Sequence, residues 1–139
     1  MPLTQAASLI TIQSISGILA ALIAGPVIDR LGRKWVMVGS LAGNGLIYYF
    51  MSGAHSYVQF AILLGLSGMC MPLYRVGADA MLADMIAPEK RPDAYAMIRL
   101  SNNAGIAIGP MLGGLLASIS YTITFICAGS GMIIYSMLL

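Results

Sequence analysis

The sequence predicts an all-α, polytopic membrane helix bundle with about five transmembrane helices, formed as one unit over residues 1–139. Three observations lead to this fold class. The chain is 59% hydrophobic and only 9% charged, whereas soluble domains carry about 25% charged residues. Its apolar residues fall into five runs that approach the roughly 20 residues a spanning helix needs. The Lys and Arg residues gather in alternate connections between these runs, as the positive-inside rule requires of antiparallel spans.

The first helix is predicted over about residues 3–27 and the second over about residues 35–51. Both contain small residues spaced four positions apart, which place a narrow face on one side of each helix and favour close packing between helices in lipid. These residues are Gly17, Ala21 and Gly25 in the first helix and Gly39 and Gly43 in the second.

The third helix, predicted over about residues 58–86, follows an uncharged turn and carries three charged side chains in its second half. Arg75 and Asp79 are four positions apart, so both can lie on one helix face and pair. Asp84 follows near the end of the helix. Charges inside a span are costly and usually face protein or a water-filled cavity. An ion pair that lets the helix tolerate its own charges and a role in transport are both open readings.

The fourth helix is predicted over about residues 94–117, after a second charged connection at residues 87–93. A stripe of small residues at every fourth position gives it the strongest packing face of the chain. The stripe consists of Ser101, Gly105, Gly109, Gly113 and Ala117, with Gly114 beside it. We expect the stripe to contact another helix of the same half, and Pro110 to kink the helix by removing a backbone hydrogen bond.

The last helix is predicted over about residues 122–139, after a second uncharged turn. It stops without a flanking charge or loop, so we expect an unfinished helix. The two uncharged turns should lie on the side opposite the two charged connections. We therefore expect the charged connections to face the cytoplasm, and His55 and Ser120 to face the other side.

The sequence contains no motif from which an enzyme site could be built. It has no phosphate-binding loop, no His-Glu-x-x-His and no Cys/His cluster with metal-ligand spacing, so we expect no catalytic residues, no cofactor and no metal. Cys70 and Cys127 lie in apolar runs and are expected to act as small packing residues. The net charge of +2 is small and most of the basic residues cluster in the connections, which argues against nucleic-acid binding.

Residues 25–34 form the first charged segment of the chain and join the first two helices. Their order, Gly-x-x-x-Asp-Arg-x-Gly-Arg-Lys, resembles the signature loop between transmembrane helices 2 and 3 of the major facilitator superfamily. The matching residues are Gly25, Asp29, Arg30, Gly32, Arg33 and Lys34. Gly32 allows the backbone angles of a tight turn, and Gly25 would let neighbouring helices approach closely where the first helix ends.

The resemblance continues through the rest of the chain. Arg75 resembles the arginine of the family's fourth helix, which is often linked to proton coupling. Residues 109–114 are similar to the Gly-Pro-x-x-Gly-Gly core of the fifth-helix signature of drug/proton antiporters, although Leu100 stands where that signature has a further glycine. Asp84 matches the family's acid at the cytoplasmic end of helix four, which pairs with the loop arginine matched by Arg33.

This resemblance implies that the five helices correspond to helices 2 to 6 of a twelve-helix transporter. The chain is then an incomplete N-terminal half that lacks helix 1 and the whole C-terminal half. Its implied function is part of a secondary active transporter that moves a small molecule by alternating access, with proton-coupled efflux. The implied location is a multi-pass position in the lipid bilayer of the plasma or inner membrane, with the signature loop gating the cytoplasmic side.

A second reading remains open. A truncated gene could produce a non-transporting membrane protein that uses its small-residue faces for packing or assembly. The identity of the substrate is not encoded in any motif found here.

Overall fold

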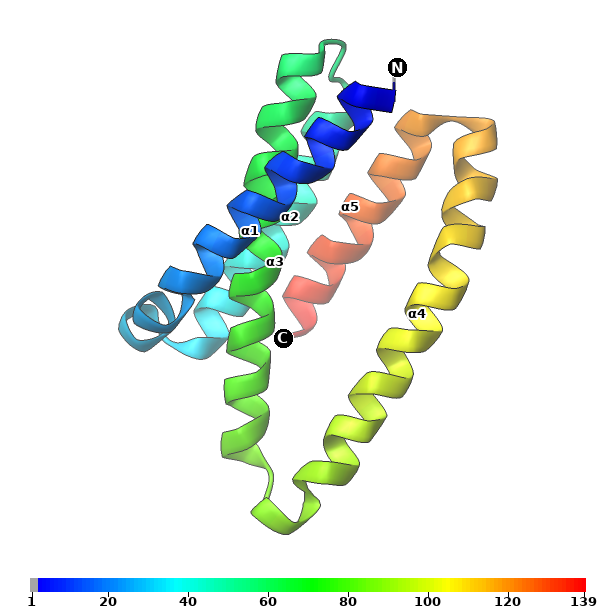
Figure 1. Cartoon of the computed structure of the whole chain (residues 1–139). Helices are drawn as coiled ribbons and strands as arrows, with labels where there is room; N and C mark the ends of the chain where they lie inside the picture. Colours follow the sequence, from blue (N-terminus) through cyan, green and yellow to red (C-terminus); the bar gives the residue numbers. More distant parts are fainter. Residues whose placement is uncertain (1–2) are drawn as a thin grey trace.

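Five long helices and one short 3₁₀ turn make up residues 3–139, the part of the chain that the computed structural model describes (Figure 1). Within these residues there is no β-strand, so the all-α prediction is confirmed. The elements are α1 (Leu3–Leu31), α2 (Arg33–Ser52), α3 (Tyr57–Met85), η1 (Pro88–Lys90), α4 (Arg91–Ile119) and α5 (Tyr121–Leu138).

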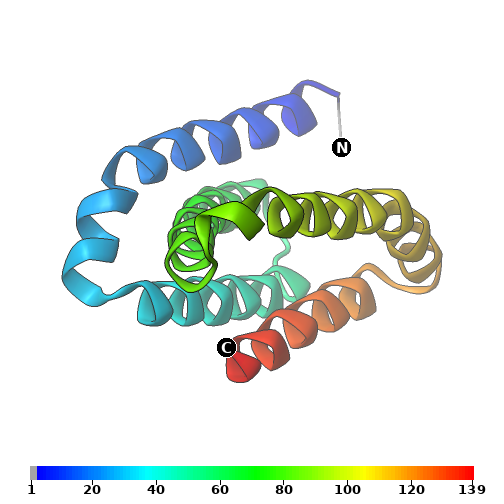
Figure 2. The same cartoon turned by 90° about the horizontal axis from the view of Figure 1, so that it is seen from below.

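Helix α1 is longer than the sequence predicts, because it continues to Leu31 through Gly25 and Pro26. Proline cannot donate a backbone hydrogen bond, and it bends a helix more readily than it ends one when the following residues remain helical. Both views show α1 changing direction toward its end (Figures 1 and 2). A Cβ atom on Gly25 would meet no atom of residues 3–139 within 4 Å, so the close helix contact expected at this glycine is not made by these residues.

Helix α3 is the central element of the bundle. Helix α1 packs along one side of it and α2 along the other, while α2 also packs against α5. The view from below shows α3 between α1 and α2 (Figure 2). Helix α4 packs more lightly, mainly against α5, and diverges from α3 along its length (Figure 1). The structure thus has a closely packed part, α1–α2–α3–α5, and a fourth helix that stands away from it.

Two pairs of glycines make the close contacts between these helices. A Cβ on Gly68 of α3 would lie 2.3 Å from the carbonyl oxygen of Gln13, and one on Gly17 would lie 3.2 Å from the carbonyl oxygen of Gly68. Between α2 and α5, a Cβ on Gly45 would lie 2.9 Å from the carbonyl oxygen of Gly129. Helices in lipid gain little from apolar burial against each other, so such backbone approach supplies their packing energy.

The small-residue stripe of α4 does not make the contact that the sequence predicts. Added Cβ atoms at its glycines would meet no atom within 4 Å; these are Gly105, Gly109, Gly113 and Gly114. No helix of residues 3–139 therefore covers the stripe, and a contact with a helix outside these residues stays a prediction. The physical reason is that α4 leaves the bundle after the charged turn. The helix remains unbroken through Pro110 and bends in its second half (Figure 1).

The outer faces of the helices are apolar, as a surface in contact with lipid requires. Large side chains such as Ile18, Leu22 and Ile62 are 63%, 73% and 59% exposed. Among residues 3–139, three helices, α1, α3 and α5, are long and apolar enough to cross a membrane. This is fewer than the five predicted spans, because α2 and α4 contain more glycine and polar residues than a lipid-facing helix does.

Gly68→Ala should destabilise the chain by about 1–3 kcal/mol, because the new methyl group overlaps the backbone of α1 and forces the two helices apart. The matched control is Gly109→Ala, which meets open space. It should change stability by no more than about 1 kcal/mol, toward greater stability, because alanine favours the helix. Reversible unfolding by sodium dodecyl sulfate in mixed micelles measures the free energy of unfolding of both variants. Equal losses in the two variants would contradict the packing described here.

Candidate functional site: a charged turn and an adjacent cleft

The two connections that contain Lys and Arg lie at the same end of the bundle. The α1–α2 turn and the α3–α4 turn are both at the lower end in Figure 1, whereas the α2–α3 and α4–α5 turns are at the opposite end. The bundle therefore has one charged end and one uncharged end. This is the arrangement that the alternation of basic residues along the sequence predicts.

Gly32 alone reverses the chain between α1 and α2. Its φ angle is 84°, the only positive φ among residues 3–139. A side chain at this position would clash with the backbone, so glycine is the residue that the turn requires. The Gly32 amide donates to the Ile28 carbonyl over 2.9 Å, and its carbonyl accepts from Val36 over 3.1 Å. The predicted role of Gly32 is confirmed, and the turn is tighter than the ten-residue segment suggested.

Apolar residues on both sides fix the position of this turn. Ile28 and Val36 are 4% and 6% exposed and form a buried cluster with Ala24. Val27 and Leu73 pack against the same cluster. Because Leu73 belongs to α3, the cluster joins the α1–α2 turn to the central helix. The charged side chains between Ile28 and Val36 therefore start from a firmly held backbone.

The Arg33 side chain lies across the last turns of α3. Its guanidinium forms an ion pair with the Asp84 carboxylate, and its Nη1 donates to the Ala80 carbonyl over 3.1 Å. Gly77 makes this approach possible, because a Cβ there would lie 2.9 Å from the Met37 Cγ. The pair implied by the family resemblance is present in the structure. Arg33 at the start of α2 is disfavoured by that helix's dipole, and Asp84 offsets it.

A second arginine, which the sequence analysis did not single out, binds the same end of α3. Arg91 donates from Nη2 to the Ala83 carbonyl over 2.6 Å and from Nε to the Ile86 carbonyl over 3.2 Å. Carbonyls in the last turn of a helix lack partners in the helix, and basic side chains commonly supply them. The sequence signal that could have indicated this role is the position of Arg91, a basic residue a few positions after the end of α3.

The other charged residues of the signature segment point away from the protein. Asp29, Arg30 and Lys34 are exposed, and none of them forms an ion pair within residues 3–139. The Asp29 carboxylate remains available for a contact outside the part of the chain described.

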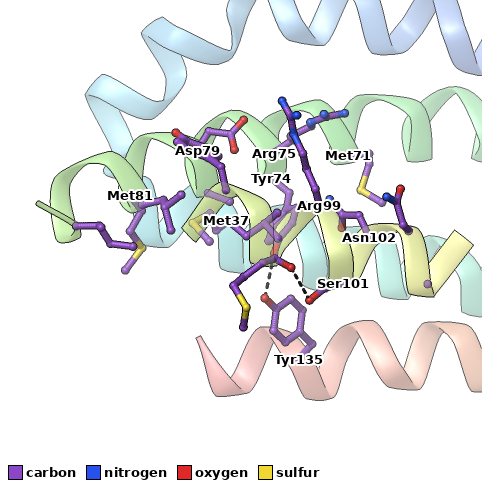
Figure 3. Close-up of a pocket in the computed structure, with 18 of the residues that line it drawn as sticks. Met37, Met71, Tyr74, Arg75, Asp79, Met81, Arg99, Ser101, Asn102 and Tyr135 are labelled. Carbon is purple, nitrogen blue, oxygen red and sulfur yellow. Dashed lines mark hydrogen bonds between the residues drawn. The ribbon is translucent and has the colours of Figure 1, made fainter. Parts of the chain in front are cut away.

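A cleft of about 1350 Å³ opens between α3 and α4 above this charged end. Helix α5 contributes Tyr135, whose hydroxyl lies 3.0 Å from the hydroxyl of Tyr74 on α3 (Figure 3). Much of the lining is sulfur-containing and flexible, and the methionines in it are Met37, Met71, Met81, Met85 and Met97. Unbranched thioether side chains adapt to ligands of different shapes. The lining therefore suits a small molecule with a substantial apolar part.

Three charged side chains line the cleft: Arg75 and Asp79 from α3, and Arg99 from α4 (Figure 3). Arg75 and Asp79 share a helix face as predicted, but no ion pair between them is present in residues 3–139. Of the two readings left open for these charges, the ion pair is not the one that the structure shows. Arg99 was not identified from the sequence, because its relation to Arg75 depends on how α3 and α4 face each other. Arg75 also borders a smaller cavity of about 410 Å³ between α1 and α3.

The whole chain, residues 1–139, matches the family model described as the Major Facilitator Superfamily. The chain belongs to the major facilitator superfamily. Its members are transporters rather than enzymes, so this chain is a multi-pass membrane protein of a transporter family. No solved structure matches the chain significantly.

Several curated relatives in this superfamily are longer proteins. A "Na(+), Li(+), K(+)/H(+) antiporter" of Planococcus maritimus is 32% identical over 120 residues, covering 80% of this chain and 27% of that protein. The "Uncharacterized MFS-type transporter YhjO" of Bacillus subtilis (strain 168) is 29% identical over 131 residues, covering 94% and 32%. "Multidrug resistance protein MdtG" of Escherichia coli O1:K1 / APEC is 35% identical over 96 residues, covering 67% and 22%. The chain thus spans about a third or less of these relatives.

The ion pair at the charged end of this major facilitator chain should contribute little to its stability. Arg33 and Asp84 side chains are 39% and 63% exposed, and exposed pairs contribute at most about 1 kcal/mol. A double-mutant cycle with Arg33→Gln and Asp84→Asn, measured by unfolding in mixed micelles, should give a coupling below that value. A parallel cycle with Lys34→Gln and Asp84→Asn should give none. Coupling above about 2 kcal/mol between Arg33 and Asp84 would contradict this assignment.

Proposed function

We propose that this chain forms part of a secondary active transporter that moves a small molecule by alternating access. The transporter would export this molecule, and the export would be coupled to the movement of protons. The observation that carries the proposal is the charged turn bound to the end of α3 beside a large, partly charged cleft. The names of two relatives, a cation/proton antiporter and a multidrug resistance protein, support it.

Alternating access requires two arrangements of the helices around a site near the middle of the membrane. Helices α1 and α2 pack closely against α3 and hold the charged turn, so we infer that these three helices act as one body. Helix α4 packs lightly and borders the cleft on its other side. We infer that the exposed Asp29 contacts a part of the transporter outside the described residues in one of the two arrangements. Arg33 and Asp84 then hold the turn at the end of α3.

We further infer that the charged end faces the cytoplasm of a cell whose plasma or inner membrane holds the protein. The rest of the substrate path would come from the parts of the longer relatives that this chain does not match. Lipid, a small-molecule substrate and protons are the partners that this function requires. A second candidate, a membrane assembly module without transport, is favoured by the uncovered glycine stripe of α4.

Cysteine labelling from each side of intact cells tests the orientation. In a background with Cys70 and Cys127 replaced by serine, Arg33→Cys should react with an impermeant maleimide only after the cells are permeabilised. Ser120→Cys should react in intact cells, because the uncharged end faces outward. Labelling of position 33 from outside intact cells would contradict the proposed orientation of the charged end.

Transport itself is tested in inside-out membrane vesicles from cells that express the gene. An imposed pH gradient should drive uptake of at least one member of a panel that contains Na⁺, a cationic dye and an anionic dye. A protonophore should abolish that uptake. If no member moves in response to the gradient, the proposed transport function fails, and self-association of the protein would favour the assembly module instead.

In the same vesicles Asp29→Asn should lower transport about tenfold and leave membrane insertion intact. The substitution removes a charge but keeps the shape of the side chain. A partly buried contact of this carboxylate with the rest of the transporter would contribute up to about 2 kcal/mol, and its loss would shift a two-state population by about tenfold. The matched control is Glu89→Gln, which removes an exposed carboxylate of η1. If Asp29→Asn transports at the wild-type rate at equal expression, the charge of Asp29 is not needed for transport and the turn serves only to orient the chain in the membrane.

A further inference from the structure

We propose that the cleft between α3 and α4 binds the anionic group of its small-molecule ligand, and that Arg75 and Arg99 are the residues that bind it. This inference rests on the proposed function only in calling that ligand the transported substrate. The chemical class is an amphipathic anion, with a carboxylate, phosphonate or sulfonate group on an apolar body.

The two arginines lie at the same depth in the bundle, although they come from different helices. Arg75 precedes the end of α3 at Met85 by ten positions, and Arg99 follows the start of α4 at Arg91 by eight. At 1.5 Å per residue these positions are about 15 Å and about 12 Å along their helices from the α3–α4 turn. Since the helices run antiparallel from one short turn, both guanidiniums reach the cleft at one level. Figure 3 shows them on facing helices.

The charge in the cleft is not balanced. Its lining contains two arginines and one acid, Asp79, with no other Asp, Glu or Lys. Neither arginine is in an ion pair within residues 3–139. Asp79 lies one helical turn nearer the charged end than Arg75 does, so it does not stand between the two guanidiniums. At this depth an uncompensated cation is costly. An anion bound between the two would lower that cost.

Guanidinium groups suit this task because they bind carboxylate, sulfonate and phosphonate oxygens through two parallel hydrogen bonds. The cleft also offers neutral donors, since the amides of Asn102 and Asn103 line it on the α4 side. The methionines and Tyr74 supply an apolar surface for the remainder of the ligand. Together these groups define a site for a molecule with one anionic end.

A matched pair of probes tests the inference on the full chain in phosphatidylcholine nanodiscs. The probes are 4-phenylbutyrate and 4-phenylbutylammonium, which share a carbon skeleton and differ in the sign of the charged end. Isothermal titration calorimetry should show the carboxylate binding at least about tenfold more tightly than the ammonium. Arg99→Gln and Arg75→Gln should each weaken carboxylate binding by about tenfold, as expected for the loss of one charged hydrogen-bonding partner.

Two further variants distinguish carboxylate binding in the cleft from a general effect of the net charge of the chain. Lys90→Gln removes the same charge from an exposed position in η1 outside the cleft and should leave carboxylate binding unchanged. Asp79→Asn should strengthen carboxylate binding. The exposed Arg99 fills no buried space, and circular dichroism of Arg99→Gln checks that the helices remain. The comparison of the two probes on the unmodified chain does not depend on any variant.

Equal affinity for the two probes, tighter binding of the ammonium, or binding of neither would overturn the inference. Loss of carboxylate binding in Lys90→Gln as large as in Arg99→Gln would also overturn it. These outcomes are separate from the transport test, because binding is measured without a gradient. A chain that binds the carboxylate but moves nothing refutes the proposed function alone, whereas proton-driven transport with no preference for anions refutes this inference alone.

Discussion

In lipid, α1 and α2 gain little by burying apolar side chains against α3, so the bundle depends on close approach of backbones. Gly68 allows α1 to lie against α3, and Gly77 allows the start of α2 to do so on the other side. Gly45 and Gly129 do the same for α2 and α5. Each contact brings a carbonyl or side-chain carbon to a position that a Cβ atom would occupy. These glycines therefore determine which helices pack together and at what distance.

The charged end of the bundle is a consequence of this packing. Because Gly77 admits the first turn of α2, Arg33 reaches both the Asp84 carboxylate and the Ala80 carbonyl. Arg91 binds the remaining carbonyls of α3 from the other connection. Two cations thus lie at the negative end of the α3 dipole, where they are stabilised. The same helix end fixes the turn before α2 and the turn before α4.

The sequence alone was sufficient for features that depend on local chemistry. Apolar runs predicted five helices, the positive φ of Gly32 followed from its place in a tight turn, and the family resemblance implied the Arg33–Asp84 pair. Features that depend on which faces meet could not be predicted. A glycine stripe identifies a face but not its partner, so the stripe at Gly109 was expected to be covered and the isolated Gly45 was overlooked. Arg99 was missed for the same reason.

Helix α4 differs from the others in how it is held. Its first residue, Arg91, binds the end of α3, and its last turn leads directly into α5. The part of α4 between these two ends has few neighbours. The close glycine contacts that hold α1, α2, α3 and α5 together do not include α4, so a change in the width of the cleft between α3 and α4 would leave them intact. A site whose ligands come from both walls, with Arg75 on the firmly packed helix and Arg99 on the lightly packed one, would respond directly to such a change. In the transporter that we propose, the charged groups of the ligand site and the lightly packed helix would then be physically linked, as alternating access requires.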